Sequence, residues 1–240
     1  MDPFQHHPEL LGQIKPASQS YFRNMDLDAV DARSAAAGRP AGWRTPCEVR
    51  EKGRRDFLQQ RRDKDLWVFG YGSLMWDPAM EFAEVRRART TSYSRRFCLW
   101  DEGARGTLAQ PGLMLAIDEG NGCEGVAFRI DADRVDHETF ILFRREMISS
   151  AYSPVWLVLE TRFGPVEALS FAANRGHERI RPDIPLTEQA RMIASARGFL
   201  GTNFEYLEST HAKLALLGIE DLYIADLHAR AQKLRASTMA

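Results

Sequence analysis

The chain has 240 residues, of which 44% are hydrophobic and 27% are charged, a composition typical of a globular protein large enough to bury a core. Its 32 Lys and Arg residues balance 33 Asp and Glu residues, which gives a formal net charge of -1. A dedicated nucleic-acid-binding protein usually has a basic excess, so we expect no nucleic-acid partner.

The cysteines and histidines follow no metal-binding or disulfide pattern. The three cysteines are an odd and sparse set without CxxC spacing, and the six histidines form no HExxH pattern. The N-terminus lacks the basic start and apolar run of a signal peptide, and no stretch approaches about 18 uninterrupted apolar residues. We therefore expect no metal site, no membrane partner and a cytoplasmic location.

The first 65 residues differ in composition from the rest, and we call them the arm. Ala32–Pro46 is rich in Ala, Gly, Pro and charge, so it buries little apolar surface by itself and is interpreted as mobile. Glu48–Asp65 is a charge-dense run, expected to be a solvated helix or linker. An alternative is that the arm drapes over a neighbouring subunit. We expect residues 1–65 to form an extension that is partly mobile or helical, and residues 66–240 to form one domain.

The first part of the domain is predicted to consist of strands. Leu66–Trp76 begins with an apolar, aromatic run that indicates a buried strand broken by glycines. Val85–Asp101 contains β-branched and aromatic residues with partial alternation, which predicts one long or two short strands. Gly112–Asp118 and Cys123–Ile130 are strand-like runs separated by a Gly-rich turn, so a hairpin is expected here.

Residues 131–149 are predicted to form a helix that ends between Glu146 and Ser149. Asp131 and Asp133 are candidate N-caps, and the apolar positions that follow lie near helical spacing. We expect the face that carries Phe140 and Phe143 to point inward.

Two more strands and then helices complete the chain. Strands are predicted over 152–161 and 165–173, with a turn at Phe163-Gly164-Pro165. Thr187 is expected to cap the next helix, and Thr202-Asn203-Phe204-Glu205 has the form of a capping box before another helix. Gly218 stands where a helix C-terminal glycine belongs, and a last amphipathic helix follows. This order indicates an α+β fold and not the regular alternation of a doubly wound sheet.

The loop Phe69–Leu74, with sequence FGYGSL, is a candidate ligand site. Its two glycines let the backbone approach a ligand closely, and successive N–H groups in such a loop suit a carboxylate or a phosphate. A dinucleotide fingerprint starting at Gly70 fails because Met75 occupies the third glycine position. Ser73 lacks the GxSxG context of a hydrolase nucleophile. Taken alone, the loop is as often a structural turn as a site.

Glu146 is a candidate acid/base. It continues the row of Phe140 and Phe143 at helical spacing, and burial on an apolar face raises the pKa of a carboxyl group. Such a group can accept and return a proton near neutral pH. The alternative is a solvated glutamate paired with a neighbouring arginine, and the spacing alone favours this alternative.

Five segments taken together resemble one family. The sequence from Leu66 to Leu234 contains, in order, VFGYGSLMW, YSRRF, RGTLAQPGLML with CEGVAFRI, RREM, and NFEYLESTHAKLALLGIEDLY. This order resembles the ChaC-like γ-glutamylcyclotransferases. The resemblance implies a small mixed β-barrel with surrounding helices, and it identifies residues 66–240 as the γ-glutamylcyclotransferase domain.

The resemblance also implies an activity and a set of site residues. The activity is conversion of glutathione to 5-oxoproline and Cys-Gly by intramolecular attack of the α-amine, with no metal or other cofactor. Glu146 is implied to be the general base and then the general acid. The residues implied to bind the γ-glutamyl substrate are Val68, Phe69, Gly70, Tyr71, Gly72, Ser73, Leu74 and Tyr152.

Several alternatives stay open at this point. The loop amides hold either the α-carboxylate or the oxyanion, and Arg105 and Asn203 match family motifs without a clear role. A cyclotransferase for other γ-glutamyl amino acids or amines would use the same residues. A non-catalytic protein that binds γ-glutamyl compounds or regulates a partner is the alternative from another class. The sequence decides neither the oligomeric state nor the role of the arm.

Overall fold

A computed structural model describes the backbone of residues 2–239. The helices are α1 (Leu27–Ala36), α2 (Cys47–Leu58), α3 (Val135–Glu146), α4 (Leu186–Ser195), α5 (Asn203–Leu216) and α6 (Leu222–Met239). The strands are β1 (Leu66–Gly70), β2 (Glu84–Thr90), β3 (Tyr93–Asp101), β4 (Gly112–Glu119), β5 (Cys123–Ile130), β6 (Tyr152–Thr161), β7 (Val166–Ala173), β8 (Arg197–Gly198) and β9 (Gly201–Thr202).

Five strands form a closed barrel. Hydrogen bonds join them in the order β1-β5-β2-β6-β7, and a parallel pairing of β1 with β7 closes the ring. The β3–β4 pair extends from the barrel, because β4 pairs in parallel with β7 through Ile117 and Ala172. The fold is therefore α+β, as the order of elements predicts, and it contains the mixed barrel that the family resemblance implies.

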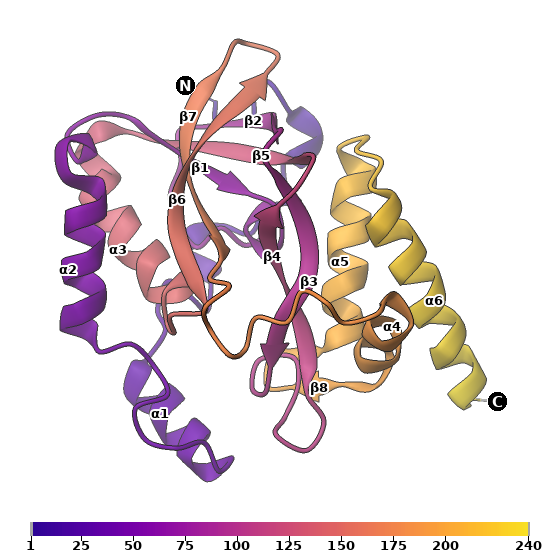
Figure 1. The fold of residues 1–240 in the computed structure, drawn as a ribbon. Coiled ribbons are helices and arrows are strands. Elements are labelled where there is room, and N and C mark those ends of the chain that lie inside the picture. Colours follow the sequence, from indigo (N-terminus) through magenta and orange to yellow (C-terminus); the bar gives the residue numbers. More distant parts are fainter. Residues whose placement is uncertain (1, 240) are drawn as a thin grey trace.

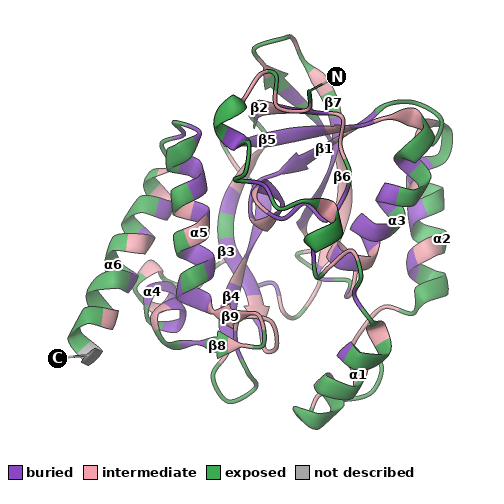
Figure 2. Ribbon diagram, turned by 180° about the vertical axis from the view of Figure 1, so that it is seen from behind, coloured by how far each residue is buried: buried purple, intermediate pink, exposed green. Residues whose placement is uncertain are grey.

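Helices cover the barrel on two opposite sides (Figure 1). α2 and α3 lie along one side, and α4, α5 and α6 lie along the other. Figure 2 shows buried residues on the barrel strands and on the helix faces turned toward them. Val68 and Phe69, on opposite faces of β1, are both fully buried, since the barrel interior lies on one side and packed elements on the other.

Several local predictions are confirmed. Val85–Asp101 contains two strands, and the turn after β6 has Gly164 at φ 98°. Thr202 and Glu205 form the complete capping box at the start of α5. Gly218 has φ 62° directly after the helix, a conformation that glycine adopts without strain.

The predicted hairpin of residues 112–118 and 123–130 is wrong. β4 pairs with β3 and β7, whereas β5 pairs with β1 and β2. The two strands are consecutive in the chain but belong to different parts of the sheet. A Gly-rich turn permits a hairpin, but closure of the barrel supplies β5 with two other partners.

The predicted inward face of α3 needs correction. Phe140 is 41% exposed, whereas Ile141, Leu142 and Phe143 are buried. The apolar run Phe140–Phe143 has four consecutive members, so its spacing does not define which of them faces the core. Glu138 and Thr139 are also on the buried side of this helix.

The predicted caps of α3 and α4 are also wrong. The residue at the N-cap of α3 is Arg134, and neither Asp131 nor Asp133 caps it with a side-chain hydrogen bond. α4 begins at Leu186 with Pro185 at its N-cap, so Thr187 lies inside the helix. The fixed φ of proline is compatible with the entry into a helix.

The arm packs against the domain through its described residues. Leu10 and Leu58 are fully buried in the main core, and the backbone N–H of Lys15 donates to the Trp76 carbonyl at 2.8 Å. α1 and α2 are the helical part of the arm. The domain boundary at residue 65 and the mobility of the arm stay predictions.

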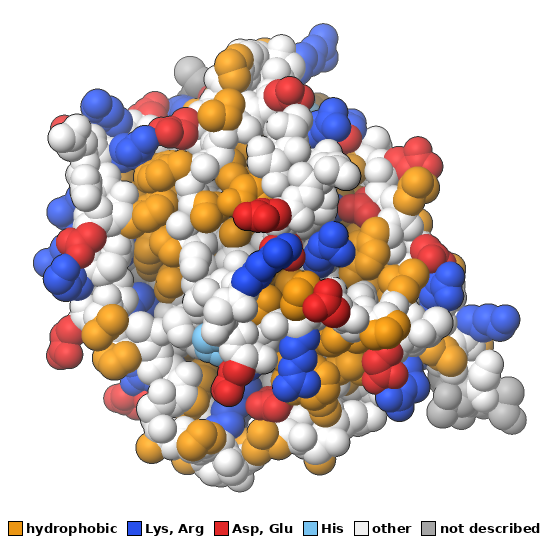
Figure 3. All heavy atoms as spheres, in the orientation of Figure 1, with side chains coloured by type: hydrophobic (Ala, Val, Ile, Leu, Met, Phe, Trp, Pro, Cys, Tyr) orange, Lys and Arg blue, Asp and Glu red, His pale blue; other side chains and the backbone are white. Residues whose placement is uncertain are grey.

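Charged side chains of both signs are mixed on the surface (Figure 3), as the near-zero net charge of the sequence suggests. On the face in Figure 3, positive and negative side chains are interspersed without a large area of one sign. Among the residues that the structure describes, no helix is both long and apolar enough to cross a membrane.

Candidate active site

One cavity collects most of the predicted site residues. It has a volume of about 540 Å³, within the range of roughly 300–1,000 Å³ typical of small-molecule sites. Its lining includes Tyr71–Leu74, Glu146 and Tyr152. The barrel supplies the loop after β1 and the start of β6, and α3 supplies its C-terminal residue. Three elements distant in sequence therefore meet at this point.

The loop after β1 is held tightly by its surroundings. A Cβ atom on Gly70 would lie 3.0 Å from the Leu74 Cβ, and one on Gly72 would lie 3.2 Å from the Tyr206 hydroxyl. Arg95 Nε donates to the Tyr71 carbonyl at 2.6 Å. The glycines are thus required for close approach of neighbouring groups, since neither has a positive φ.

Amide donors of this loop are available to a ligand. Within residues 2–239, the backbone N–H groups of Gly72, Ser73 and Leu74 have no hydrogen-bond acceptor, whereas the N–H of Met75 donates to the Gly72 carbonyl. Consecutive free N–H groups create a local positive potential. The loop can therefore bind a carboxylate or stabilise a developing oxyanion.

Glu146 combines burial with one ion pair. Its side chain is 14% exposed, and its Oε1 lies 2.8 Å from Arg145 Nε. Burial raises the pKa of Glu146 above its ordinary value, while the positive charge of Arg145 opposes this rise. Because Glu146 is the last residue of α3, the negative end of the helix dipole also disfavours its ionised form. The carboxyl group is suited to accept and return a proton.

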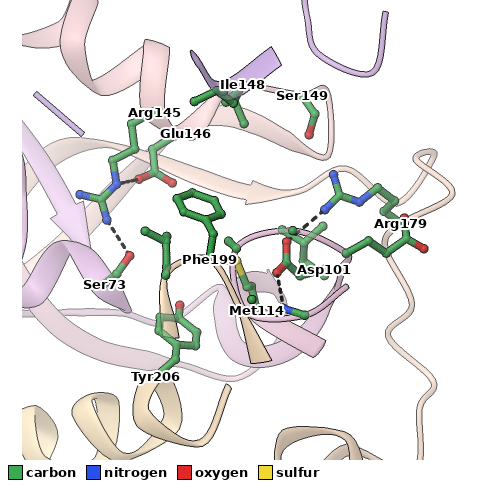
Figure 4. A pocket seen from close by; sticks show the side chains of 18 of the residues that line it. Ser73, Asp101, Met114, Arg145, Glu146, Ile148, Ser149, Arg179, Phe199 and Tyr206 are labelled. Carbon is green, nitrogen blue, oxygen red and sulfur yellow. Dashed lines mark hydrogen bonds and ion pairs between the residues drawn. The ribbon is translucent and has the colours of Figure 1, made fainter. Parts of the chain in front are cut away.

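Arg145 connects Glu146 to the loop. Its Nη2 donates to the Ser73 hydroxyl at 2.7 Å, and its Nη1 donates to the Asp77 carbonyl. Figure 4 shows the guanidinium between Ser73 and Glu146, with the carboxylate turned toward Phe199. Arg145 therefore fixes the position of the carboxylate relative to the loop.

Three tyrosines border the same space. The Tyr71 hydroxyl donates to the Phe171 carbonyl and the Tyr152 hydroxyl to the Leu115 carbonyl, each at 2.7 Å. Burial raises the pKa of Tyr71 and Tyr152 well above the ordinary value, and it raises the pKa of Tyr206 to about 12. All three phenols stay protonated at neutral pH. The O–H donors of Tyr71 and Tyr152 are used on the backbone, so these two residues shape the cavity, and Tyr206 has a hydroxyl that can donate to a ligand.

The other predicted residues have different places. Val68, Phe69 and Gly70 lie in β1 and do not border the cavity. Ser73 does border it, but its hydroxyl accepts a hydrogen bond from Arg145. Sequence reasoning did not identify Tyr206 as a cavity residue, although it belongs to the NFEY segment.

Asn203 and Arg105 make contacts that connect the start of α5 to the rest of the domain. The Asn203 side chain accepts from the N–H of Leu113 and donates to its carbonyl, both at 2.7 Å. Arg105 Nη1 donates to the Thr202 carbonyl at 3.2 Å, and its guanidinium lies 5.6 Å from the Tyr206 ring centroid. Asn203 joins α5 to β4, and Arg105, from the segment between β3 and β4, contacts the start of α5 and the Tyr206 ring.

The arm supplies cavity-lining residues that the sequence did not predict. Phe22 packs under Arg145, whose Cζ lies 4.1 Å from the ring centroid. Arg33 and Arg39 also border the cavity. In the sequence these residues belong to a polar segment rich in Ala and Gly, and such a composition does not indicate a binding surface.

Comparisons with known proteins show what the chain is similar to. A family profile described as "ChaC-like protein" matches residues 66–234. The chain is 41% identical to a glutathione-specific γ-glutamylcyclotransferase of Escherichia coli, with 71% of this chain and 74% of that protein covered. It is 32% identical to a protein of the same name from Schizosaccharomyces pombe, with 70% and 93% covered.

A solved structure supports the fold independently. It is a yeast γ-glutamylcyclotransferase described as specific to glutathione, with a TM-score of 0.66 and 21% identity. The match covers 72% of this chain and 97% of the yeast chain. At this identity the likeness concerns the fold alone.

Proposed function

This chain belongs to the ChaC-like family, and from that premise we propose that it converts glutathione to 5-oxoproline and Cys-Gly. The observation that carries the proposal is one cavity lined both by the largely buried Glu146 carboxyl and by a loop with free amide donors. The relatives from Escherichia coli and Schizosaccharomyces pombe are named for this activity.

The reaction needs positioning and two proton transfers, both through one carboxyl group. The α-amine of the glutamyl group bonds to its own γ-carbonyl carbon, and the bond from that carbon to the cysteine nitrogen breaks. Glu146 takes a proton from the attacking amine and gives it to the leaving nitrogen, as general base and then general acid. Burial raises its pKa above the ordinary value, so this carboxyl group holds a proton more readily than an exposed glutamate does.

Tyr71–Leu74 and Tyr152 form the γ-glutamyl site in this proposal, and Val68–Gly70 of β1 support the loop without bordering the cavity. The flexible glutamyl chain must bend until its amine touches the carbonyl carbon. Well-oriented intramolecular reactions have effective molarities of roughly 10⁵–10⁸ M, so holding this bent form supplies much of the rate. The free amides of Gly72–Leu74 bind either the α-carboxylate or the oxyanion that forms on the carbonyl.

Purified protein incubated with millimolar glutathione tests the proposal. With a chelator and without nucleotide, we expect 5-oxoproline and Cys-Gly in equal amounts by mass spectrometry. Glu146→Gln keeps the shape of the side chain but removes proton transfer, so the rate is expected to fall by roughly 10²–10⁴-fold. Glu160→Gln, at an exposed position on β6, is the matched control and should retain full activity. Absence of 5-oxoproline with the wild-type protein would reject the proposal.

A further inference from the structure

The arm forms part of the active-site cavity although it precedes the family-matched region 66–234. Nine of its side chains border this space: Tyr21, Phe22, Met25, Val30, Arg33, Ser34, Ala37, Arg39 and Trp43. These residues belong to α1 and its flanking segments. The region matched by the family profile therefore accounts for only part of the cavity wall.

Polar contacts fasten the arm to the helix that carries Glu146. Arg23 makes two hydrogen bonds to Glu138, at 2.7 and 3.0 Å. The Arg144 side chain donates to the backbone carbonyls of Phe22 and Arg23. Because Glu138 and Arg144 both belong to α3, the arm has a defined position relative to Glu146.

The cavity has two chemically different ends, as Figure 4 shows. Ser73, Arg145 and Glu146 lie at one end, and Asp101 with Arg179 lies at the other, with Phe199 between them. If the first end holds the γ-glutamyl group, the second end receives the part of the substrate that leaves. In glutathione this part is Cys-Gly, which terminates in a carboxylate.

Arg39 of the arm is a cation at the second end. Its Nη2 would lie 3.1 Å from a Cβ on Gly103, and its guanidinium lies 4.8 Å from the Trp43 ring centroid. Burial and the charge of Arg179 lower the pKa of the Arg39 guanidinium, and the carboxylates of Asp101 and Glu102 raise it. These contacts place the guanidinium on the side of the cavity opposite Glu146.

The Arg39 guanidinium has no hydrogen-bond acceptor among residues 2–239. Its Nη2 is buried without a partner, whereas Nε and Nη1 are neither bonded nor fully buried. The nearby Asp101 carboxylate already accepts from the backbone N–H groups of Arg105 and Gly106. An arginine with unused donors beside a cavity is suited to bind a carboxylate, because the two groups match in charge and in planar geometry.

We propose that residues 21–43 of the arm form the subsite for the leaving dipeptide, and that Arg39 binds its terminal carboxylate. The inference rests on the proposed function, and it adds a residue that determines specificity. The bond from Arg39 forms far from the scissile amide, so it is made equally in the ground state and the transition state. Its loss should raise KM and leave kcat nearly unchanged.

The test compares two substrates and two proteins. Glutathione and glutathione amide, in which a carboxamide replaces the glycine carboxylate, are each assayed with wild type and with Arg39→Gln. A hydrogen bond between charged groups contributes enough that kcat/KM for glutathione should fall by about ten- to a hundredfold in the variant. For the amide, the variant and the wild type should agree within about threefold, because the contact to the carboxylate is already absent.

Controls separate this role from a structural one. Arg55→Gln removes a similar charge from an exposed position on α2 and should leave both substrates unaffected. Arg39→Lys keeps the positive charge and should restore part of the preference for glutathione. An equal loss on both substrates, or an unchanged preference in Arg39→Gln, would overturn the inference. A wild-type protein that cleaves neither substrate would instead reject the proposed function.

Discussion

The two walls of the cavity are built in different ways. The wall from the barrel consists of backbone amides, tyrosines and Glu146, and its parts are fixed by strand pairing and by the packing of α3. The wall from the arm consists largely of aromatic and arginine side chains, fixed by hydrogen bonds to α3. One wall depends on the core, and the other depends on a small number of polar contacts.

This difference suits the barrel wall to hold the reacting groups and the arm wall to bind the far end of the substrate. A reacting amine and carbonyl must be held to within a fraction of an ångström, which only a densely packed wall can achieve. Binding the far end of a peptide tolerates more freedom, so a surface segment can supply it. We therefore expect changes in the barrel wall to affect kcat and changes in the arm wall to affect KM.

Arg23→Ala should have the largest effect on stability, because it breaks the contact that fixes the arm wall. Glu138 is 2% exposed, and without Arg23 its carboxylate keeps only the hydrogen bond from the backbone N–H of Glu81. Breaking a buried ion pair typically costs about 3–5 kcal/mol, so the free energy of unfolding should fall by that amount. Chemical denaturation of the variant and the wild type measures this fall.

Arg61→Ala is the matched control for that experiment. Arg61 also makes a two-oxygen contact with a glutamate, Glu167, but both side chains are about half exposed. Exposed pairs contribute about 0–1 kcal/mol, and the cation–π contact of Arg61 with the Trp156 ring at 4.2 Å adds about 0.5–1 kcal/mol, so this variant should lose at most about 2 kcal/mol. Equal results for Arg23→Ala and Arg61→Ala would show that the arm is not fixed through Glu138, and the comparison of the two walls would fail.

Gly125→Ala changes the barrel wall and should have an intermediate effect. A Cβ on Gly125 would lie 2.3 Å from the Gly70 carbonyl oxygen, so the start of the ligand-binding loop must shift. Overpacking of this kind costs about 1–3 kcal/mol of stability. The displaced loop should also lower kcat, measured by 5-oxoproline formation under saturating glutathione.

The control for Gly125→Ala is the same substitution at Gly53. This glycine lies inside α2, and a Cβ atom added to it would have no neighbouring atom within 4 Å. Alanine there should raise the free energy of unfolding by about 0.4–1 kcal/mol and leave kcat unchanged. A rise in KM without a change in kcat for Gly125→Ala would contradict the role assigned to the barrel wall.

The sequence predicted the barrel wall better than the arm wall, for physical reasons. The loop Phe69–Leu74 and the capping box at Thr202 are local patterns, because neighbouring residues supply the two glycines of the loop and both hydrogen bonds of the capping box. The arm wall forms only when arginines such as Arg23 meet partners more than a hundred residues away. A charged segment carries the same pattern whether its arginines are solvated or bonded to such partners.

The same distinction explains the errors within the domain. The partners of β4 and β5 are decided by barrel closure, which the turn between them does not encode. The orientation of Phe140 depends on where α3 contacts the barrel, since four consecutive apolar residues satisfy several helical faces. The spacing of Glu146 did not decide between a buried acid/base and a glutamate paired with arginine; its side chain is 14% exposed and paired with Arg145, and its catalytic role stays a prediction from the family resemblance.

The smallest expected effect is the pH dependence of stability caused by Glu146. Burial places the folded-state pKa of this carboxyl above its ordinary value of 4.5, so the native state holds the proton more tightly than the unfolded state. Wild type therefore loses stability as pH rises from 4.5 through the folded-state pKa, whereas Glu146→Gln has no proton to lose. Unfolding measured from acidic to neutral pH should show the variant gaining stability relative to wild type across that window. A relative loss would mean that the attraction of Arg145 outweighs burial, and the barrel wall would then favour a charged carboxylate unsuited to return its proton.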